Sequence, residues 1–240
     1  MGVRGSMVSS PELISFASRD ALAERVADIV ELSVANGIAR DGRGELAVSG
    51  GSTPKPVYAA LAKRDLAWDR TTLTLVDERW VPPNHEASNE TFVRNAFDGA
   101  PVNRIIGMYS EGVSPAGDVS RVAAQLEEKN KEFDAVILGM GNDGHTASWF
   151  PHAQGLEEAL SSDNLVCDLR ARQSSVTGEH VDRITLTLSA IKSAAQVILL
   201  ITGDDKRATF EKALEPGTEN DMPVRAILRA RPDMWVCWAP

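Results

Sequence analysis

The chain has 240 residues, a formal net charge of −9, and hydrophobic and charged fractions of 43% and 25%. This composition is typical of a globular protein, and the acidic balance argues against nucleic-acid binding, which needs a basic face. No segment has the roughly 20 apolar residues of a membrane span. Two cysteines, Cys167 and Cys237, are too few for a disulfide framework, so we expect a reducing cytoplasm.

The pattern of apolar residues predicts alternating strands and helices along the whole chain. The predicted helices are residues 20–39, 54–63, a segment capped by Ser88 or Asn89 that carries Phe97, 116–132, 206–214 and 224–228. The predicted strands are residues 45–49, 73–76, 105–109, 135–138, 165–169, 183–188, 197–202 and 234–238. Residues 155–159 fit a short helix or a loop. Residues 183–188 alternate polar and apolar side chains, which predicts one wetter face.

This alternation predicts a single α/β domain over residues 1–240, with three layers and a doubly wound, mostly parallel, Rossmann-like sheet that has helices on both faces. The linkers are too short and too evenly spread to mark a domain boundary. Residues 1–6 could be a cloning remnant before a native start at Met7 or a natural terminus. We expect a monomer or a weak homodimer.

The strongest functional signal follows the predicted strand at residues 135–138. Three glycines occur within residues 139–144, and Asp143 and His145 are set among them. Glycine allows close approach of a ligand to the backbone, and open α/β sheets bind ligands at the carboxyl ends of their strands. A carboxylate and an imidazole two residues apart in such a turn indicate proton transfer.

Three other predicted strand ends carry polar residues, and a parallel sheet brings these ends to one edge. Gly50, Gly51, Ser52 and Thr53 separate a strand from a helix, an arrangement that suits a phosphate. Lys206 follows another strand and adds an ammonium group. Arg183, at the start of its strand, could bind the same phosphate with two N–H groups.

Asp77 and Arg79 follow a third strand, and with Asp143 and His145 they suit the reacting end of a ligand. The four histidines have no ligand spacing, so we expect no metal site. No serine lies in a Gly-x-Ser-x-Gly elbow, which argues against a serine hydrolase.

Four segments together resemble the 6-phosphogluconolactonase family: G-G-S-T-P-K-P-V-Y, D-E-R-W-V-P-P with S-N-E-T-F, G-M-G-N-D-G-H-T-A-S-W-F-P, and R-I-T-L-T-L. The resemblance covers residues 46–206 in the family's order. It implies the fold of glucosamine-6-phosphate deaminase and ribose-5-phosphate isomerase, and hydrolysis of 6-phospho-D-glucono-1,5-lactone in the oxidative pentose phosphate pathway without a cofactor. Trp149 stands where the family usually has leucine, and residues 180–182 lack the family's common prolines.

The related deaminases and isomerases are the main alternative. Deaminases of this fold carry a glutamate five residues after the histidine of the turn, where this chain has Phe150. This difference favours the lactonase. A sugar-phosphate sensor that binds without turnover is a third possibility, but the chain has no spare basic segment for the DNA-binding module that normally accompanies one.

The resulting hypothesis is acid–base catalysis by His145 on a water molecule that attacks the lactone carbonyl. Arg79 and backbone amides of a glycine-rich turn would stabilise the tetrahedral oxyanion. Protonated His145 would then return its proton to the departing ring oxygen. Asp143 or Asp77 would orient the imidazole or the water, and the sequence leaves both open.

Overall fold

The computed structural model describes residues 10–128 and 132–240. Residues 1–6 and the predicted helical residues 129–131 lie outside this range. The helices are α1 Arg19–Asp41, α2 Lys55–Leu61, η1 Trp68–Arg70, α3 Asn89–Ala96, α4 Pro115–Glu127, α5 Leu156–Ser161, α6 Leu188–Lys192, α7 Asp204–Leu214 and α8 Val224–Ala230. The strands are β1 Leu13–Ser15, β2 Gly44–Val48, β3 Thr71–Leu75, β4 Asp77–Arg79, β5 Arg104–Ile106, β6 Ala135–Gly139, β7 Val166–Arg170, β8 Asp182–Leu186, β9 Gln196–Thr202 and β10 Trp235–Ala239.

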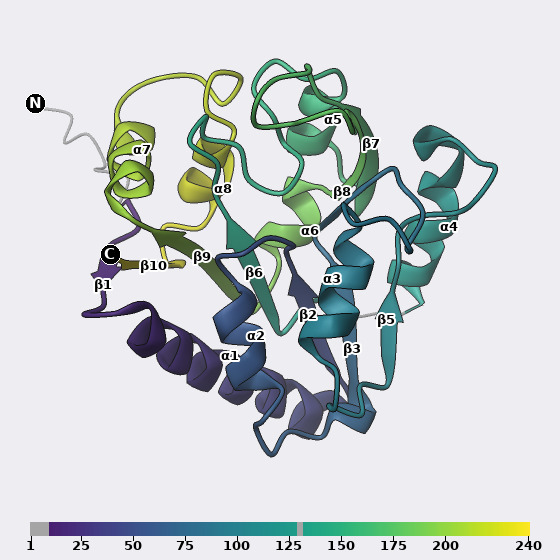
Figure 1. Ribbon diagram of the computed structural model, residues 1–240, viewed down its shortest axis with the longest axis vertical. Helices are drawn as coiled ribbons and strands as arrows, with labels where there is room; N and C mark the ends of the chain where they lie inside the picture. Colours follow the sequence, from purple (N-terminus) through teal and green to yellow (C-terminus); the bar gives the residue numbers. More distant parts are fainter. Residues whose placement is uncertain (1–9, 129–131) are drawn as a thin grey trace, which may run out of the picture.

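Seven strands form one parallel sheet in the order β1-β10-β9-β6-β2-β3-β5 (Figure 1). After β2 the chain proceeds to β3 and β5 on one side, and from β6 it proceeds to β9 and β10 on the other. The strand order therefore reverses between β2 and β6, and open α/β sheets bind ligands in the crevice outside the strands at this point. The predicted doubly wound α/β fold is confirmed.

Helices cover both faces of the sheet. Right-handed crossovers place α1, α2 and α3 on one face and the helices from α4 onward on the other. α1 contacts α2, and α2 contacts α3, while α5, α6, α8 and α7 contact one another in that order. In Figure 1, α1 and α2 lie along the lower side of the sheet, and α5 to α8 lie above it.

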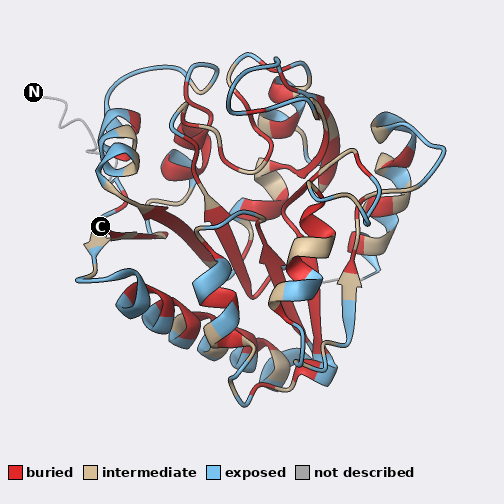
Figure 2. Ribbon diagram, viewed as in Figure 1, coloured by how far each residue is buried: buried red, intermediate tan, exposed pale blue. Residues whose placement is uncertain are grey.

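The central strands are buried on both sides, as Figure 2 shows. Every residue of β2 and β3 is buried, and so are residues 135–138 of β6. They are buried because helices cover both faces of the sheet, although β2 contains Glu45 and β3 contains three threonines. The buried apolar side chains form one cluster that extends from α1 to β10. Among the described helices, even α1 lacks the apolar length that a bilayer crossing requires.

A second, antiparallel sheet has the strand order β4-β8-β7, and it corrects two sequence interpretations. Asp77 and Arg79 lie in strand β4 rather than in a turn, because the chain continues extended after β3 and pairs with β8. The predicted strand 183–188 has no wet face: residues 183–186 of β8 are all buried, and Thr187 caps helix α6. The packing of this small sheet on the main core buries both faces of its central strand, β8, whereas β7 ends at the exposed Arg170.

Candidate active site

Four strand ends enclose a cavity of about 530 Å³ at the reversal point of the sheet. It is lined by Ser49, Gly50, Gly51, Ser52, Thr53, Pro54, Asp77, Arg79, Asn89, Gly139, Met140, Gly141, Asn142, His145, Ala147, Phe150, Val176, Arg183 and Lys206. Nine of the ten residues predicted for the site line the cavity, and the tenth, Asp143, contacts His145 beside it.

Asp143 and His145 form a close pair in the turn after β6. Oδ1 of Asp143 lies 2.5 Å from Nδ1 of His145 and also accepts the backbone N–H of His145 at 3.1 Å. Burial alone would raise the pKa of Asp143, but the hydrogen bond and charge of His145 bring that pKa below its usual value. An ionised Asp143 assigns the proton of neutral His145 to Nδ1 and leaves Nε2 as an acceptor.

Two glycines in the turn allow Asp143 and His145 to adopt this arrangement. A Cβ atom at Gly141 would overlap Nδ1 of His145 and Oδ1 of Asp143, so any larger residue would separate them. Gly144 has a φ of 79°, in the left-handed region that glycine tolerates best. Phe150 packs on the imidazole of His145 with ring centroids 4.3 Å apart, so a ring without a titratable group lies against His145.

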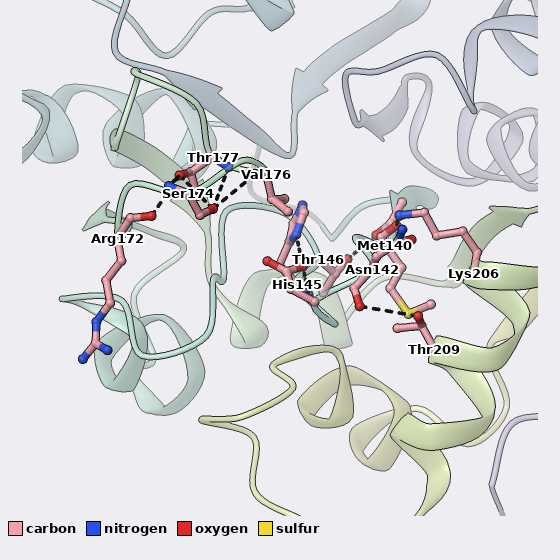
Figure 3. A network of polar contacts seen from close by, with 12 residues as sticks. Met140, Asn142, His145, Thr146, Arg172, Ser174, Val176, Thr177, Lys206 and Thr209 are labelled. Carbon is pink, nitrogen blue, oxygen red and sulfur yellow. Dashed lines mark hydrogen bonds and ion pairs between the residues drawn. The ribbon is translucent and has the colours of Figure 1, made fainter.

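The groups that are predicted to bind a phosphate lie at the ends of two strands, β2 and β9, which have β6 between them. Gly50–Thr53 follow β2, and within the described residues the hydroxyls of Ser52 and Thr53 have no protein hydrogen-bond partner. Lys206 follows β9, and its Nζ donates to the carbonyl of Met140 at 2.5 Å. Burial lowers the pKa of Lys206, and the charge of Asp143 partly offsets this. In the view of Figure 3, Lys206 and Val176 lie on either side of His145.

Two arginines lie on the small sheet. Arg79 on β4 donates to the carbonyl of Ala87 at 2.8 Å. Arg183 is 2% exposed and donates to the carbonyls of His180 and Thr177. Arg183 is therefore not a solvated surface charge.

The guanidinium of Arg183 keeps its charge and one unused donor. Its Nε is buried without a hydrogen-bond partner. Burial lowers the pKa of Arg183 to about 10, while the charge of Asp77 acts in the opposite direction. Arg183 is therefore protonated near neutral pH, and it brings a positive charge to the wall of the cavity.

Asp77 also lines the cavity, and its hydrogen-bond partners differ from those of Asp143 and His145. Its carboxylate accepts from Ser148 Oγ at 2.5 Å and, more weakly, from Asn89 Nδ2 at 3.4 Å. Within the described residues no hydrogen bond joins Asp77 to His145, whereas Asp143 contacts it directly. Sequence reasoning assigned no role in the site to Asn89 or Ser148, although both lie in the segments that carry the family resemblance.

The remaining histidines lie outside this cavity's lining. The rings of His85 and His180 meet edge to face at 4.8 Å, which joins the loops before α3 and β8. His152 lies 3.4 Å from Asp221 at the surface. Within residues 10–128 and 132–240, no three His, Cys, Asp or Glu side chains form a group that could hold a metal ion.

The fold and site define a class of α/β proteins that act on sugar phosphates, and the comparisons with known proteins specify the family. Residues 17–238 match the family described as glucosamine-6-phosphate isomerases/6-phosphogluconolactonase. The chain is 38% identical over 230 residues to 6-phosphogluconolactonase of Rhizobium meliloti, covering 94% of this chain and 97% of that one. It is 40% identical over 225 residues to the Mesorhizobium japonicum enzyme of the same name, covering 92% and 90%.

Solved structures agree with this match. A 6-phosphogluconolactonase from Shewanella baltica superimposes with a TM-score of 0.90 at 33% identity, covering 98% of this chain and 100% of that one. A monomeric glucosamine-6-phosphate deaminase shares the fold, with a TM-score of 0.77 at 17% identity over 95% of this chain and 97% of that one. The chain belongs to the glucosamine-6-phosphate isomerase/6-phosphogluconolactonase family, and these two curated relatives are named 6-phosphogluconolactonase.

Proposed function

We propose that this protein hydrolyses 6-phospho-D-glucono-1,5-lactone to 6-phospho-D-gluconate in the pentose phosphate pathway, with His145 as the general base. The observation that carries the proposal is the contact of 2.5 Å between Asp143 and His145, in a cavity that also contains three cationic side chains. Asp143 holds the imidazole so that Nε2 accepts a proton from water, and the resulting hydroxide attacks the lactone carbonyl. We therefore assign the orientation of the base to Asp143 rather than to Asp77.

The cationic groups match the charges that develop on the substrate. Gly50, Gly51, Ser52, Thr53 and Lys206 hold the phosphate in this proposal, through amides, hydroxyls and an ammonium group. Arg183 adds its positive charge to the cavity that receives the anionic ligand. Arg79 stabilises the tetrahedral oxyanion as it forms. Protonated His145 then transfers its proton to the ring oxygen as the C–O bond breaks, so no metal ion or cofactor takes part.

Phe150 supports the lactonase over a deaminase or isomerase. Ring opening by a deaminase requires an acid–base group near the histidine, and the side chain stacked on His145 is an apolar ring. Phe150 cannot transfer a proton, but it does not obstruct attack by water.

The test is proton release from freshly prepared lactone, measured in a weakly buffered solution. We expect purified protein to accelerate acidification far above the spontaneous rate, and a His145→Ala variant to bind 6-phosphogluconate while losing this acceleration. Binding without acceleration in the wild type would instead identify a sugar-phosphate sensor. Release of ammonia from glucosamine 6-phosphate would identify a deaminase.

We further propose that residues 1–240 act as one catalytic domain in the cytoplasm, as a monomer or weak homodimer. The single buried core and the two buried, free cysteines support a unit that folds in a reducing compartment. One cooperative unfolding transition and a mass measured by light scattering would test these points.

A further inference from the structure

Ser148 connects two parts of the site that lie far apart in sequence. It belongs to the turn after β6 that carries His145, and its Oγ donates to Oδ2 of Asp77 on β4 at 2.5 Å. Ser148 is completely buried. Ala147 before it has a φ of 50°, a left-handed conformation that is unusual for alanine and that reverses the chain at this point. The backbone is thus held in a strained form that directs Ser148 toward Asp77.

Asp77 is held from its other side by helix α3. Asn89 Nδ2 donates to the backbone carbonyl of Asp77 at 2.8 Å and lies 3.4 Å from Oδ1. A Cβ atom at Gly50 would overlap the side chain of Asn89, so this glycine leaves space for the amide. Glu78 accepts the backbone N–H groups of Asn89 and Glu90 at 2.8 Å each, which fixes the start of the helix against β4.

This anchoring keeps Asp77 apart from the arginines. Within the described residues no ion pair joins Asp77 to Arg79 or Arg183, although Asp77 is close enough to Arg183 for its charge to raise the pKa of that residue. A carboxylate accepts hydrogen bonds at about four lone-pair positions. On Asp77, Ser148 and Asn89 occupy two of these positions. Because the side chain of Asp77 lines the cavity, its remaining positions can accept hydrogen bonds from a ligand there.

The cavity otherwise offers mainly hydrogen-bond donors. Arg79, Arg183, Lys206 and the amides after β2 all donate. Asp77 is the one carboxylate among the described residues that line the cavity. A lactone ring with free hydroxyl groups needs acceptors for its O–H hydrogens, and an ionised carboxylate is a strong one.

We propose that Asp77 is the specificity-determining residue that accepts hydrogen bonds from the ring hydroxyls of the sugar lactone, and that Ser148 is its positioning residue. This inference rests on the proposed lactonase function, and it assigns Asp77 to hydroxyl recognition rather than to proton transfer. Ser148 fixes the carboxylate, so a ring lacking the matching hydroxyl leaves one acceptor position of Asp77 without a donor while Ser148 and Asn89 stay bonded to it. Such a site rejects the deoxy analogue because a buried polar group then loses its partner.

The test compares 6-phospho-D-glucono-1,5-lactone with its three monodeoxy analogues at C2, C3 and C4. We expect the wild type to reject at least one analogue by about 100-fold or more in kcat/KM. Ser148→Ala should reduce this ratio about tenfold, since it removes one charge-assisted hydrogen bond. Asp77→Asn should also reduce the ratio, and adding Ser148→Ala to Asp77→Asn should reduce it little further, because Ser148 acts through Asp77.

Thr146→Val is the matched control. Thr146 is also fully buried in the same turn, but its hydroxyl donates to the backbone carbonyl of Gly139 and does not touch Asp77. We expect the Thr146→Val variant to have the same ratio of kcat/KM values between the lactone and each deoxy analogue as the wild type. If Ser148→Ala slowed hydrolysis of all four lactones by one common factor, Ser148 would be merely structural and the proposal would be overturned. A wild type that does not discriminate among the lactones would overturn the role of Asp77.

Binding separates this inference from the function on which it rests. Titration calorimetry with 6-phosphogluconate and its monodeoxy analogues measures hydroxyl recognition without turnover. If the protein fails to hydrolyse the lactone but shows the same discrimination in binding, and Ser148→Ala weakens it, the proposed function fails while the role of Asp77 stands. Equal binding of all the acids by wild type and variants would overturn the inference even in an active enzyme.

Discussion

Arg79 and Arg183 are direct partners across the antiparallel pair of strands β4 and β8. Like charges placed opposite each other destabilise a sheet, and here the charge of Arg79 lowers the pKa of Arg183. Both side chains line the cavity. The fold thus concentrates positive charge where the proposed reaction creates an anion, in a protein whose net charge is −9.

We expect removal of one arginine of this pair to lower activity and to raise stability. We expect Arg79→Met to lower kcat by about 100-fold or more, because an oxyanion donor is lost. The same change should relieve repulsion and raise the free energy of unfolding by about 0.5 kcal/mol at low salt. Urea denaturation at low and high salt checks this, since screening should reduce the gain. A variant that is less stable than the wild type at low salt would contradict the prediction.

We expect that adding one methyl group at Gly141 lowers activity. Gly141→Ala should separate Asp143 from His145 because the added Cβ overlaps both side chains. We expect kcat to fall by about 100-fold or more, since proton transfer by a positioned base contributes 10²–10⁴. Gly139→Ala, at the end of β6, is the comparison, because a Cβ there meets no atom within 4 Å. Equal losses in the two variants would contradict the steric argument.

Lys206 should act on the phosphate and not on the lactone. We expect Lys206→Met to raise KM for the phosphorylated lactone about 10- to 100-fold, as loss of a buried charge-assisted contact implies. The same variant should hydrolyse unphosphorylated gluconolactone as slowly as the wild type does. Initial rates on both substrates test this. An equal loss on both substrates would place Lys206 at the reacting end of the site.

Glu78 should make stability depend on pH. Burial raises the pKa of Glu78 to about 7 from an ordinary value of 4.5, and backbone N–H groups of Asn89, Glu90 and Arg79 only partly oppose this. The pKa of Glu78 is higher in the folded than in the unfolded protein. The stabilisation that Glu78 contributes is therefore fully present below pH 4.5 and is lost as the pH rises through about 7. The slope of this contribution is at most about 1.4 kcal/mol per pH unit.

The measurement for Glu78 is the unfolding free energy of wild type and Glu78→Gln between pH 5 and pH 8. The variant is expected to be less stable throughout, because an amide nitrogen cannot accept the N–H groups at the start of α3. The difference between the two proteins should shrink as the pH rises. A difference that is constant or grows would show that Glu78 is already ionised at pH 5.

Most of the elements were predictable from sequence because they depend on local patterns. Helix α1, for example, begins after a Ser18 cap and ends at Gly42 with a φ of 77°. Strand β1 was not predicted, since three residues carry too little periodicity. Helix α6 was also missed, because Thr187 continues the alternation of β8 while its hydroxyl already caps the helix.

The sequence by itself determined the alternation of strands and helices, the glycine-rich turn with Asp143 and His145, and the family. These depend on residue types close together in the chain. The strand order was decided only in the tertiary structure, and it places the turns after β2 and β6 side by side. The pairing of Arg79 with Arg183 and the contact of Ser148 with Asp77 also appear only there. Such contacts join residues 71 or more positions apart, and packing of the small sheet on the core, not local propensity, brings them together.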